Sequence, residues 1–132
     1  MSDIVYADLL GRPFHETDWS CWQLVREIYR RLGIDLPAYP YGSNLQERAA
    51  AAESAKSQFV RLDGPQPWAI VAIQAIASRG GIIHTGVCLP DLAHVLHVRE
   101  QCGTILTPLS ILRRGHCVEG FYGWKNANYC SQ

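Results

Sequence analysis

One cysteine and two histidines lie in segments where they can serve nucleophilic catalysis. Cys21 opens a segment with helical periodicity, whereas His84 and His97 lie in later segments with the pattern of strands. A thiol attacks a carbonyl as the thiolate, and a free cysteine has a pKa of about 8.5, so it needs assistance at neutral pH. The first turn of a helix supplies amide donors and the positive end of the helix dipole. An imidazolium nearby stabilises the thiolate and can then protonate a leaving amine.

The strand around His84 favours a role for that histidine. Alternation puts His84, Gly86 and Cys88 on one face of the strand, and Gly86 leaves space beside the imidazole. A histidine on the next strand can reach the far nitrogen of His84 and fix its tautomer, as the third member of a triad does. His94 and His97 are both on that strand, but they lie on opposite faces, so only one of them can point at His84.

An amphipathic helix is expected to position the cysteine. Residues 18–32 carry an apolar face at helical spacing, formed by Cys21, Val25, Ile28, Tyr29 and Leu32. Asp18 or Ser20 can cap its start, and Gly33 suits a left-handed stop. A second helix is predicted over residues 44–58, where a run of alanines gives high helix propensity.

The histidines are expected to lie in an antiparallel sheet. Residues 63–67 break the helical pattern, and the segments that follow are short, rich in β-branched or aromatic residues and separated by glycine or proline. The predicted strands are 68–73, 82–89, 94–99, 104–107 and 117–124, with turns at 79–81 and 101–103. Helices followed by such a sheet predict an α+β fold in a single domain, residues 1–132.

Composition excludes several function classes. The chain has 132 residues with 12 basic and 12 acidic side chains, so no electrostatic feature predicts a nucleic-acid partner. The longest apolar stretch, 68–77, is too short to span a bilayer. The N-terminus lacks the basic and apolar regions of a signal peptide, so we expect a soluble chain made in the cytoplasm.

The five cysteines predict at least one free thiol rather than a disulfide framework, because their number is odd and none forms a CxxC pair. A late disulfide between Cys117 and Cys130 is an alternative. A zinc site is another, but its candidate ligands have irregular spacing where structural sites use close pairs, so no metal or cofactor is expected. Those candidates are His84, Cys88, His94, His97 and Cys102.

Seven short motifs occur in order over residues 9–124. They are Gly11-Arg12-Pro13-Phe14, Cys21-Trp22-Gln23-Leu24-Val25-Arg26, Leu32-Gly33-Ile34-Asp35-Leu36-Pro37-Ala38-Tyr39, His84-Thr85-Gly86-Val87, Leu96-His97-Val98, Thr107-Pro108-Leu109 and Glu119-Gly120-Phe121-Tyr122. Each motif alone is weak, but the ordered set resembles the NlpC-type cell-wall cysteine peptidases. The resemblance is to the small forms encoded in tail modules of tailed bacteriophages and gene transfer agents.

This resemblance implies a papain-like fold and a set of roles. Cys21 corresponds to the nucleophile, His84 to the general base and acid, and His97 to the orienting partner, which favours His97 over His94. The implied reaction is hydrolysis of an amide bond in peptidoglycan stem peptides, without a cofactor. The implied setting is a virion tail tip, where the enzyme opens the cell wall locally and binds tail hub proteins.

Residues beside the nucleophile are candidates for substrate binding. Trp19, Ser20 and Trp22 flank Cys21, and the two indoles are expected either to line the substrate groove or to pack in the core or a lid. Aromatic residues farther along the chain are expected to serve packing or a protein interface.

Departures from the family pattern suggest a second reading. Ser20 replaces a usual aspartate, Gln23 a common glycine, and Phe14 a tyrosine whose hydroxyl can assist an oxyanion. Trp68-Ala69 stands where the family usually has Gly-Asp before the central strand. Because losing one oxyanion donor costs about 2.7–4 kcal/mol, the alternative is a catalytically weak or inactive structural tail-tip protein. A cysteine acyltransferase or deamidase acting on proteins is a third reading, since the fold does not dictate the acceptor.

Overall fold

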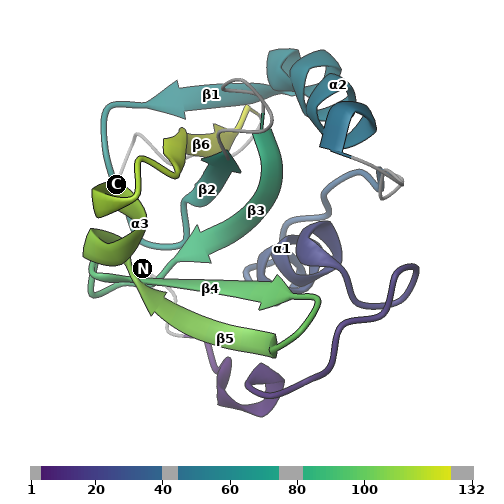
Figure 1. Ribbon diagram of the computed structural model, residues 1–132, viewed down its shortest axis with the longest axis vertical. Helices are drawn as coiled ribbons and strands as arrows, with labels where there is room; N and C mark the ends of the chain where they lie inside the picture. The colour runs from purple at the N-terminus through teal and green to yellow at the C-terminus, as the bar shows by residue number, and fades with distance from the viewer. Residues whose placement is uncertain (1–3, 40–44, 75–81, 126–132) are drawn as a thin grey trace.

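The protein is a mixed α+β structure built on one six-stranded sheet (Figure 1). The computed structural model describes residues 4–39, 45–74 and 82–125. Its elements are η1 (Ala7–Leu9), α1 (Cys21–Arg31), α2 (Leu45–Ala55), η2 (Lys56–Gln58), β1 (Phe59–Leu62), β2 (Ile70–Gln74), β3 (Ile82–Cys88), β4 (His94–Arg99), β5 (Gly103–Pro108), α3 (Leu109–Arg114) and β6 (Val118–Trp124). No helix in this described part has the length and apolar character needed to cross a membrane.

Helix α1 confirms the expected helix but begins three residues later, at Cys21. The backbones of His15 and Trp19 pair with each other through two hydrogen bonds of 3.0 Å, which holds that segment in a tight loop instead of a helical turn. The predicted apolar face is buried except at Leu32, which is half-buried. The helix ends at Arg31, and Gly33 after it has a φ of 86°, the left-handed conformation expected there.

The sheet has the strand order β1-β6-β2-β3-β4-β5, and all its pairings are antiparallel. Strand β2 lies inside the sheet, and its residues are buried on both faces except at Gln74. Strand β3 pairs with β4 at only two positions, Val87 with Leu96 and Cys88 with Val95. Beyond these pairs the two strands part, which opens the sheet on the side toward His84.

Two cores stabilise the two faces of the sheet. On one face α1 buries Leu24, Val25 and Ile28 against β2, β3 and β4. On the other face α3 buries Leu109 and Leu112 against β2, β4 and β6. Figure 1 shows α3 across the sheet from α1 and α2. Each face therefore has its own helical cover, and the helix that begins at the cysteine is fixed by the larger core.

Three parts of the sequence prediction need correction. The second helix ends at Ala55, and the residues after it form η2 and then β1, an edge strand that was not predicted because four residues are too few for a periodic pattern. Helix α3 was not predicted either, since it has only six residues. The predicted turn at 79–81 lies outside the described residues, whereas the turn before Gly103 is present.

Candidate active site

A cleft at the parting of β3 and β4 brings together the three residues singled out by their chemistry. Its volume is about 270 Å³. Cys21 comes from the start of α1, His84 from β3 and His97 from β4. The rest of its lining consists of Phe14, Ile73, Gln74, Ile83, Val98, Arg99, Glu100, Gln101, Leu112 and Cys117. Because the strands have separated here, residues from both faces of the sheet can line one cavity.

Cys21 is the first residue of α1 and is only 9% exposed. Ser20 occupies the N-cap position in an extended conformation, and its carbonyl accepts the first helical hydrogen bond, from the Leu24 amide at 3.1 Å. The expected side-chain cap is not made by Ser20. The positive end of the helix dipole therefore faces the cleft at Cys21, where it favours negative charge on sulfur or on a bound oxyanion.

His84 and His97 contact each other across the cleft wall. The Nε2 atom of His84 lies 2.9 Å from the Nδ1 atom of His97, and the two rings meet edge to face. Gly86 makes this approach possible, because a methyl group added there would lie 2.7 Å from the Leu96 carbonyl oxygen and 2.9 Å from the His97 Cβ atom. With Nε2 of His84 directed at His97, its Nδ1 is the ring atom that can exchange a proton with a thiol.

His97 is the inner member of the histidine pair and is 2% exposed. Burial, together with the positive charge of Arg99, lowers its pKa from 6.5 to about 4. The Nε2 atom of His97 lies 2.7 Å from the Thr107 hydroxyl oxygen on β5. His97 is thus a neutral ring at physiological pH, held at both nitrogens.

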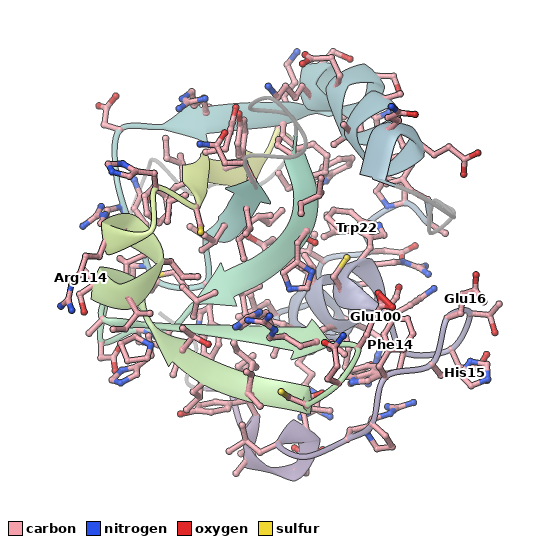
Figure 2. The ribbon with its side chains drawn as sticks, in the orientation of Figure 1. Phe14, His15, Glu16, Trp22, Glu100 and Arg114 are labelled. Atoms are coloured by element: carbon pink, nitrogen blue, oxygen red, sulfur yellow. The ribbon has the colours of Figure 1, made fainter. Side chains whose placement is uncertain are left out.

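The other histidines lie away from the pair. His94, the alternative partner on β4, instead meets Asp91, whose carboxylate oxygen is 2.7 Å from its Nδ1 atom. His15 and His116 are exposed. In Figure 2 His15 and Glu16 point outward from the loop before α1, whereas Phe14 and Glu100, which line the cleft, lie beside the helix.

The candidate substrate-binding residues Trp19 and Ser20 are buried, which for Trp19 is the packing alternative. Trp19 is 3% exposed, its indole N–H donates to the Thr104 hydroxyl at 2.7 Å, and the guanidinium of Arg12 stacks on its outer face. The side chain of Ser20 is buried too. Trp19 and Ser20 therefore support the start of α1 from within the protein, and neither lines the cleft around Cys21.

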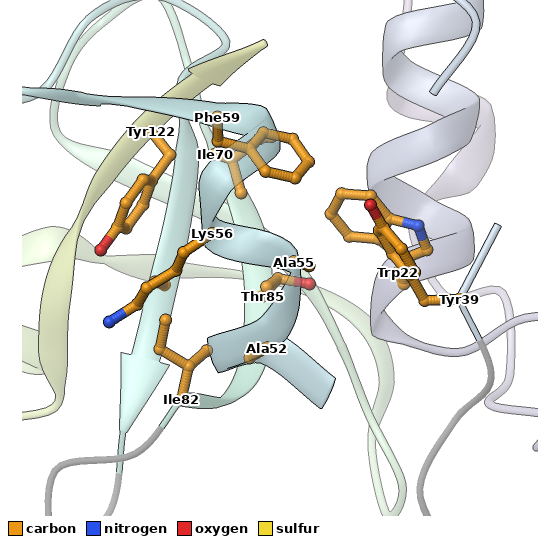
Figure 3. A pocket seen from close by; sticks show the side chains of 11 residues that line it. Trp22, Tyr39, Ala52, Ala55, Lys56, Phe59, Ile70, Ile82, Thr85 and Tyr122 are labelled. Atoms are coloured by element: carbon orange, nitrogen blue, oxygen red, sulfur yellow. The ribbon is translucent and has the colours of Figure 1, made fainter. Parts of the chain in front are cut away.

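Trp22 lines a second, smaller cavity of about 70 Å³ on the α1 side of the sheet (Figure 3). Its indole N–H donates to the Pro37 carbonyl at 2.7 Å, and its ring contacts Tyr39 and Phe59. Figure 3 shows Trp22 and Tyr39 on one wall, opposite Phe59 and Tyr122. The indole thus belongs to an apolar cavity separate from the one that Cys21 and His84 line.

The remaining cysteines have environments unlike that of Cys21. Cys88 is fully buried, and burial raises the pKa of its thiol to about 11. Cys102 is exposed, and Cys117 lines the cleft on the side opposite α1. Cys130, the partner of Cys117 in the alternative disulfide, lies outside the described residues. Within residues 4–39, 45–74 and 82–125, no three histidine, cysteine or acidic side chains are arranged to hold a metal ion.

Sequence reasoning found the three central residues but missed the side chains that hold them. Thr107 and Thr104, both on β5, contact His97 and Trp19. Thr107 belongs to a motif that was noted only as part of a family pattern. Since β5 was placed correctly by its pattern, alternation along it could have predicted that these two residues face opposite sides of the sheet.

No family model matches this chain, and no curated protein sequence matches it either. The family resemblance carried by the ordered motifs therefore remains a prediction.

Proposed function

We propose that the protein is a cysteine amidase or endopeptidase that cleaves stem peptides of peptidoglycan, with Cys21 as nucleophile, His84 as general base and acid, and His97 as orienting residue. One observation carries the proposal. The thiol at the start of α1 and a histidine pair with a 2.9 Å contact line the same cleft, although they come from three separate elements. A buried packing cysteine does not require such a partner set.

The geometry supports a two-step acyl transfer. The Nδ1 atom of His84 takes the Cys21 proton, and the thiolate attacks the amide carbon to give a tetrahedral oxyanion next to the first turn of α1. The C–N bond then breaks, His84 delivers its proton to the leaving amine, and a thioester remains on Cys21. Water, deprotonated by His84, hydrolyses the thioester and regenerates the thiol.

The choice of peptidoglycan as substrate rests on the ordered motifs, and the backbone at Trp68 adds support to them. Trp68 has a φ of 63°, a left-handed conformation that costs most residues about 1–2 kcal/mol and glycine almost nothing. It stands just before the central strand, at the place where the resembled family has a glycine. A shared backbone shape at this position is expected if the chain descends from that family.

The proposed setting is the tail tip of a bacteriophage or gene transfer agent, where the hydrolase opens the wall locally and is held by tail hub proteins. This part of the proposal rests on the resemblance to the small tail-encoded forms. A catalytically inactive tail-tip protein of the same fold is the alternative.

The decisive experiment is mass spectrometry of Gram-negative peptidoglycan incubated with the protein and its variants. The unmodified protein is expected to release new stem-peptide fragments, and Cys21→Ala to reduce them by at least about a thousandfold. Cys102→Ala, which removes an exposed thiol outside the cleft, is the matched control and should retain activity. No fragments from a folded protein at high concentration would contradict the hydrolase proposal.

Thiol reactivity separates the hydrolase from the inactive alternative. An activated Cys21 should be alkylated by iodoacetamide at neutral pH much faster than Cys117 or the buried Cys88. A rate for Cys21 no higher than theirs would favour a structural role. Transfer of the acyl group to an added amine in preference to water would favour an acyltransferase.

A further inference from the structure

We propose that Thr107 is a positioning residue that stabilises the protonated form of His84 through His97, as the last acceptor in a chain of hydrogen bonds that begins at His84. This inference rests on the proposed function only for the importance of a protonated His84 beside the Cys21 thiolate. The chain of contacts itself is a property of the fold, and it can be measured without a substrate.

The contacts form a continuous line from β3 through β4 to β5. Nε2 of His84 lies 2.9 Å from Nδ1 of His97, and Nε2 of His97 lies 2.7 Å from the Thr107 hydroxyl oxygen. Both separations suit direct hydrogen bonds. Each ring nitrogen of His97 therefore has one partner, and its neutral ring must donate through one nitrogen and accept through the other.

The strand register explains why Thr107 reaches His97. In the β4–β5 pair His97 stands opposite Ile105, and Val95 stands opposite Thr107. Since alternate residues share a face, all four side chains lie on the α3 side of the sheet, and Thr107 is a diagonal neighbour of His97. The antiparallel pairing of two regular strands thus fixes the hydroxyl at the far nitrogen of the buried ring.

Protonation of His84 forces the direction of the chain. An imidazolium at His84 carries N–H on both ring nitrogens, so its Nε2 must donate to Nδ1 of His97. His97 then carries its own proton on Nε2, which must donate to the Thr107 oxygen. The opposite direction, with the Thr107 hydroxyl donating to His97, would place two N–H groups against each other at the 2.9 Å contact. Thr107 is therefore an acceptor whenever His84 is charged.

The positive charge of the pair belongs on His84 because His97 is buried. The charged groups that line the cleft beside the histidines are Arg99 at the end of β4 and Glu100 in the following turn, with the thiols of Cys21 on α1 and Cys117 before β6. Arg99 disfavours charge on His97, and the partners of that ring among the described residues are His84 and the Thr107 hydroxyl. A neutral hydroxyl acceptor thus completes the chain, and it accepts from His97 without drawing the proton away from the pair.

Two variants of Thr107 separate positioning from packing. Thr107→Val keeps the shape and removes the acceptor, whereas Thr107→Ser keeps the hydroxyl and removes a methyl group. Two readouts apply to each protein: the alkylation rate of Cys21 by iodoacetamide as a function of pH, and the ¹⁵N chemical shifts of His84 and His97, which report protonation and tautomer. Neither readout uses peptidoglycan, so a failed peptidoglycan assay would leave this test intact.

With Thr107→Val we expect the alkylation rate of Cys21 near pH 7 to fall about tenfold, because a buried N–H of His97 loses its acceptor when His84 is charged. The titration of His84 should move to lower pH by about one unit, which corresponds to the same tenfold change. Thr107→Ser should restore the alkylation rate and the His84 acid dissociation constant to within about twofold of the unmodified protein. An unchanged pH profile in Thr107→Val, or a loss in Thr107→Ser as large as that in Thr107→Val, would overturn the proposal. If Thr107→Val does not fold, the ¹⁵N shifts of the unmodified protein still test the proposal. A His97 ring protonated on Nδ1 while His84 is charged would overturn the proposal.

Discussion

At the scale of single residues, His97 makes the stability of the protein depend on pH. Its pKa in the folded protein is about 4, below the ordinary value of 6.5, because the ring is buried. Between these two pH values the unfolded chain binds a proton that the folded protein does not bind. Stability is therefore complete above about pH 6.5 and is lost as the pH falls toward 4, by up to about 3 kcal/mol.

This dependence can be measured by urea denaturation between pH 4.5 and 7. His97→Asn removes the titrating ring, so the variant should show a flatter dependence of the unfolding free energy on pH in this window. Equal slopes in His97→Asn and the unmodified protein would show that another group is responsible.

Sequence patterns predicted which residues the cleft brings together better than the side chains that support them. Cys21, His84 and His97 were identifiable because thiol and imidazole groups are rare and their strands and helix have clear periodicity. Thr107 was not, because a threonine in a strand is common and its role depends on the register of two strands. The choice between the groove and the core stayed open for Trp19 for a similar reason, since nothing in the local sequence shows that its indole N–H has a buried acceptor on β5.

At the scale of elements, the contact between β3 and β4 at Gly86 controls the approach of the two histidines. A methyl group at this position would lie within 3 Å of the Leu96 carbonyl oxygen, the His97 Cβ atom and a Val95 methyl group. Backbone atoms and β-branched side chains cannot move away easily, so β4 must shift. Gly86→Ala should lower the unfolding free energy by about 1–3 kcal/mol and separate His97 from His84.

The effect of Gly86→Ala is measurable in two ways that should agree. Urea denaturation gives the loss of stability, and the ¹⁵N shifts of the histidines show whether the pair is intact. Gly64→Ala is a suitable control, because a methyl group there would meet no atom within 4 Å and the backbone is not left-handed. Unchanged histidine signals in Gly86→Ala would mean that the two histidines approach each other without the glycine.

Element boundaries show where the sequence is informative and where it is not. The ranges of β3, β4 and α1 were close to the predictions because the two strands are rich in β-branched residues and the helix has an apolar face at helical spacing. Strand β1 and helix α3 depend on long-range contacts instead. Strand β1 exists because it pairs with β6 at Phe59–Trp124 through Leu62–Phe121, far along the chain. The apolar side chains of Leu109 and Leu112 hold α3 on a sheet face that the local sequence does not reveal.

At the scale of the whole molecule, strand β5 supports both halves of the candidate site. Thr107 on its α3 side contacts His97, and Thr104 on its α1 side contacts Trp19, two residues before Cys21. The Thr104 hydroxyl also donates to the Arg12 carbonyl at 2.9 Å, and the backbones of Thr104, Gly11 and Arg12 are paired. One edge strand thus ties the loop before α1 to the sheet that carries the histidines.

This arrangement predicts that Thr104→Val weakens the cysteine half of the site and leaves the histidine half unchanged. The substitution removes the acceptor of the Trp19 indole N–H and the donor to the Arg12 carbonyl at a position that is 1% exposed. Leaving such groups unpaired costs about 1–3 kcal/mol, which urea denaturation will show. The loop before α1 should become less well fixed. The alkylation rate of Cys21 should then no longer depend on the protonation of the histidine pair.

The ¹⁵N shifts of His84 and His97 should be the same in Thr104→Val as in the unmodified protein, because Thr104 faces the other side of the sheet from His97. Thr104→Ser keeps the hydroxyl and should retain the stability and the thiol reactivity of the unmodified protein. If Thr104→Val shifted the histidine signals as much as Thr107→Val does, the two threonines would act through the stability of β5 alone. The site would then be held by the strand as a unit, and neither hydroxyl would have a separate positioning role.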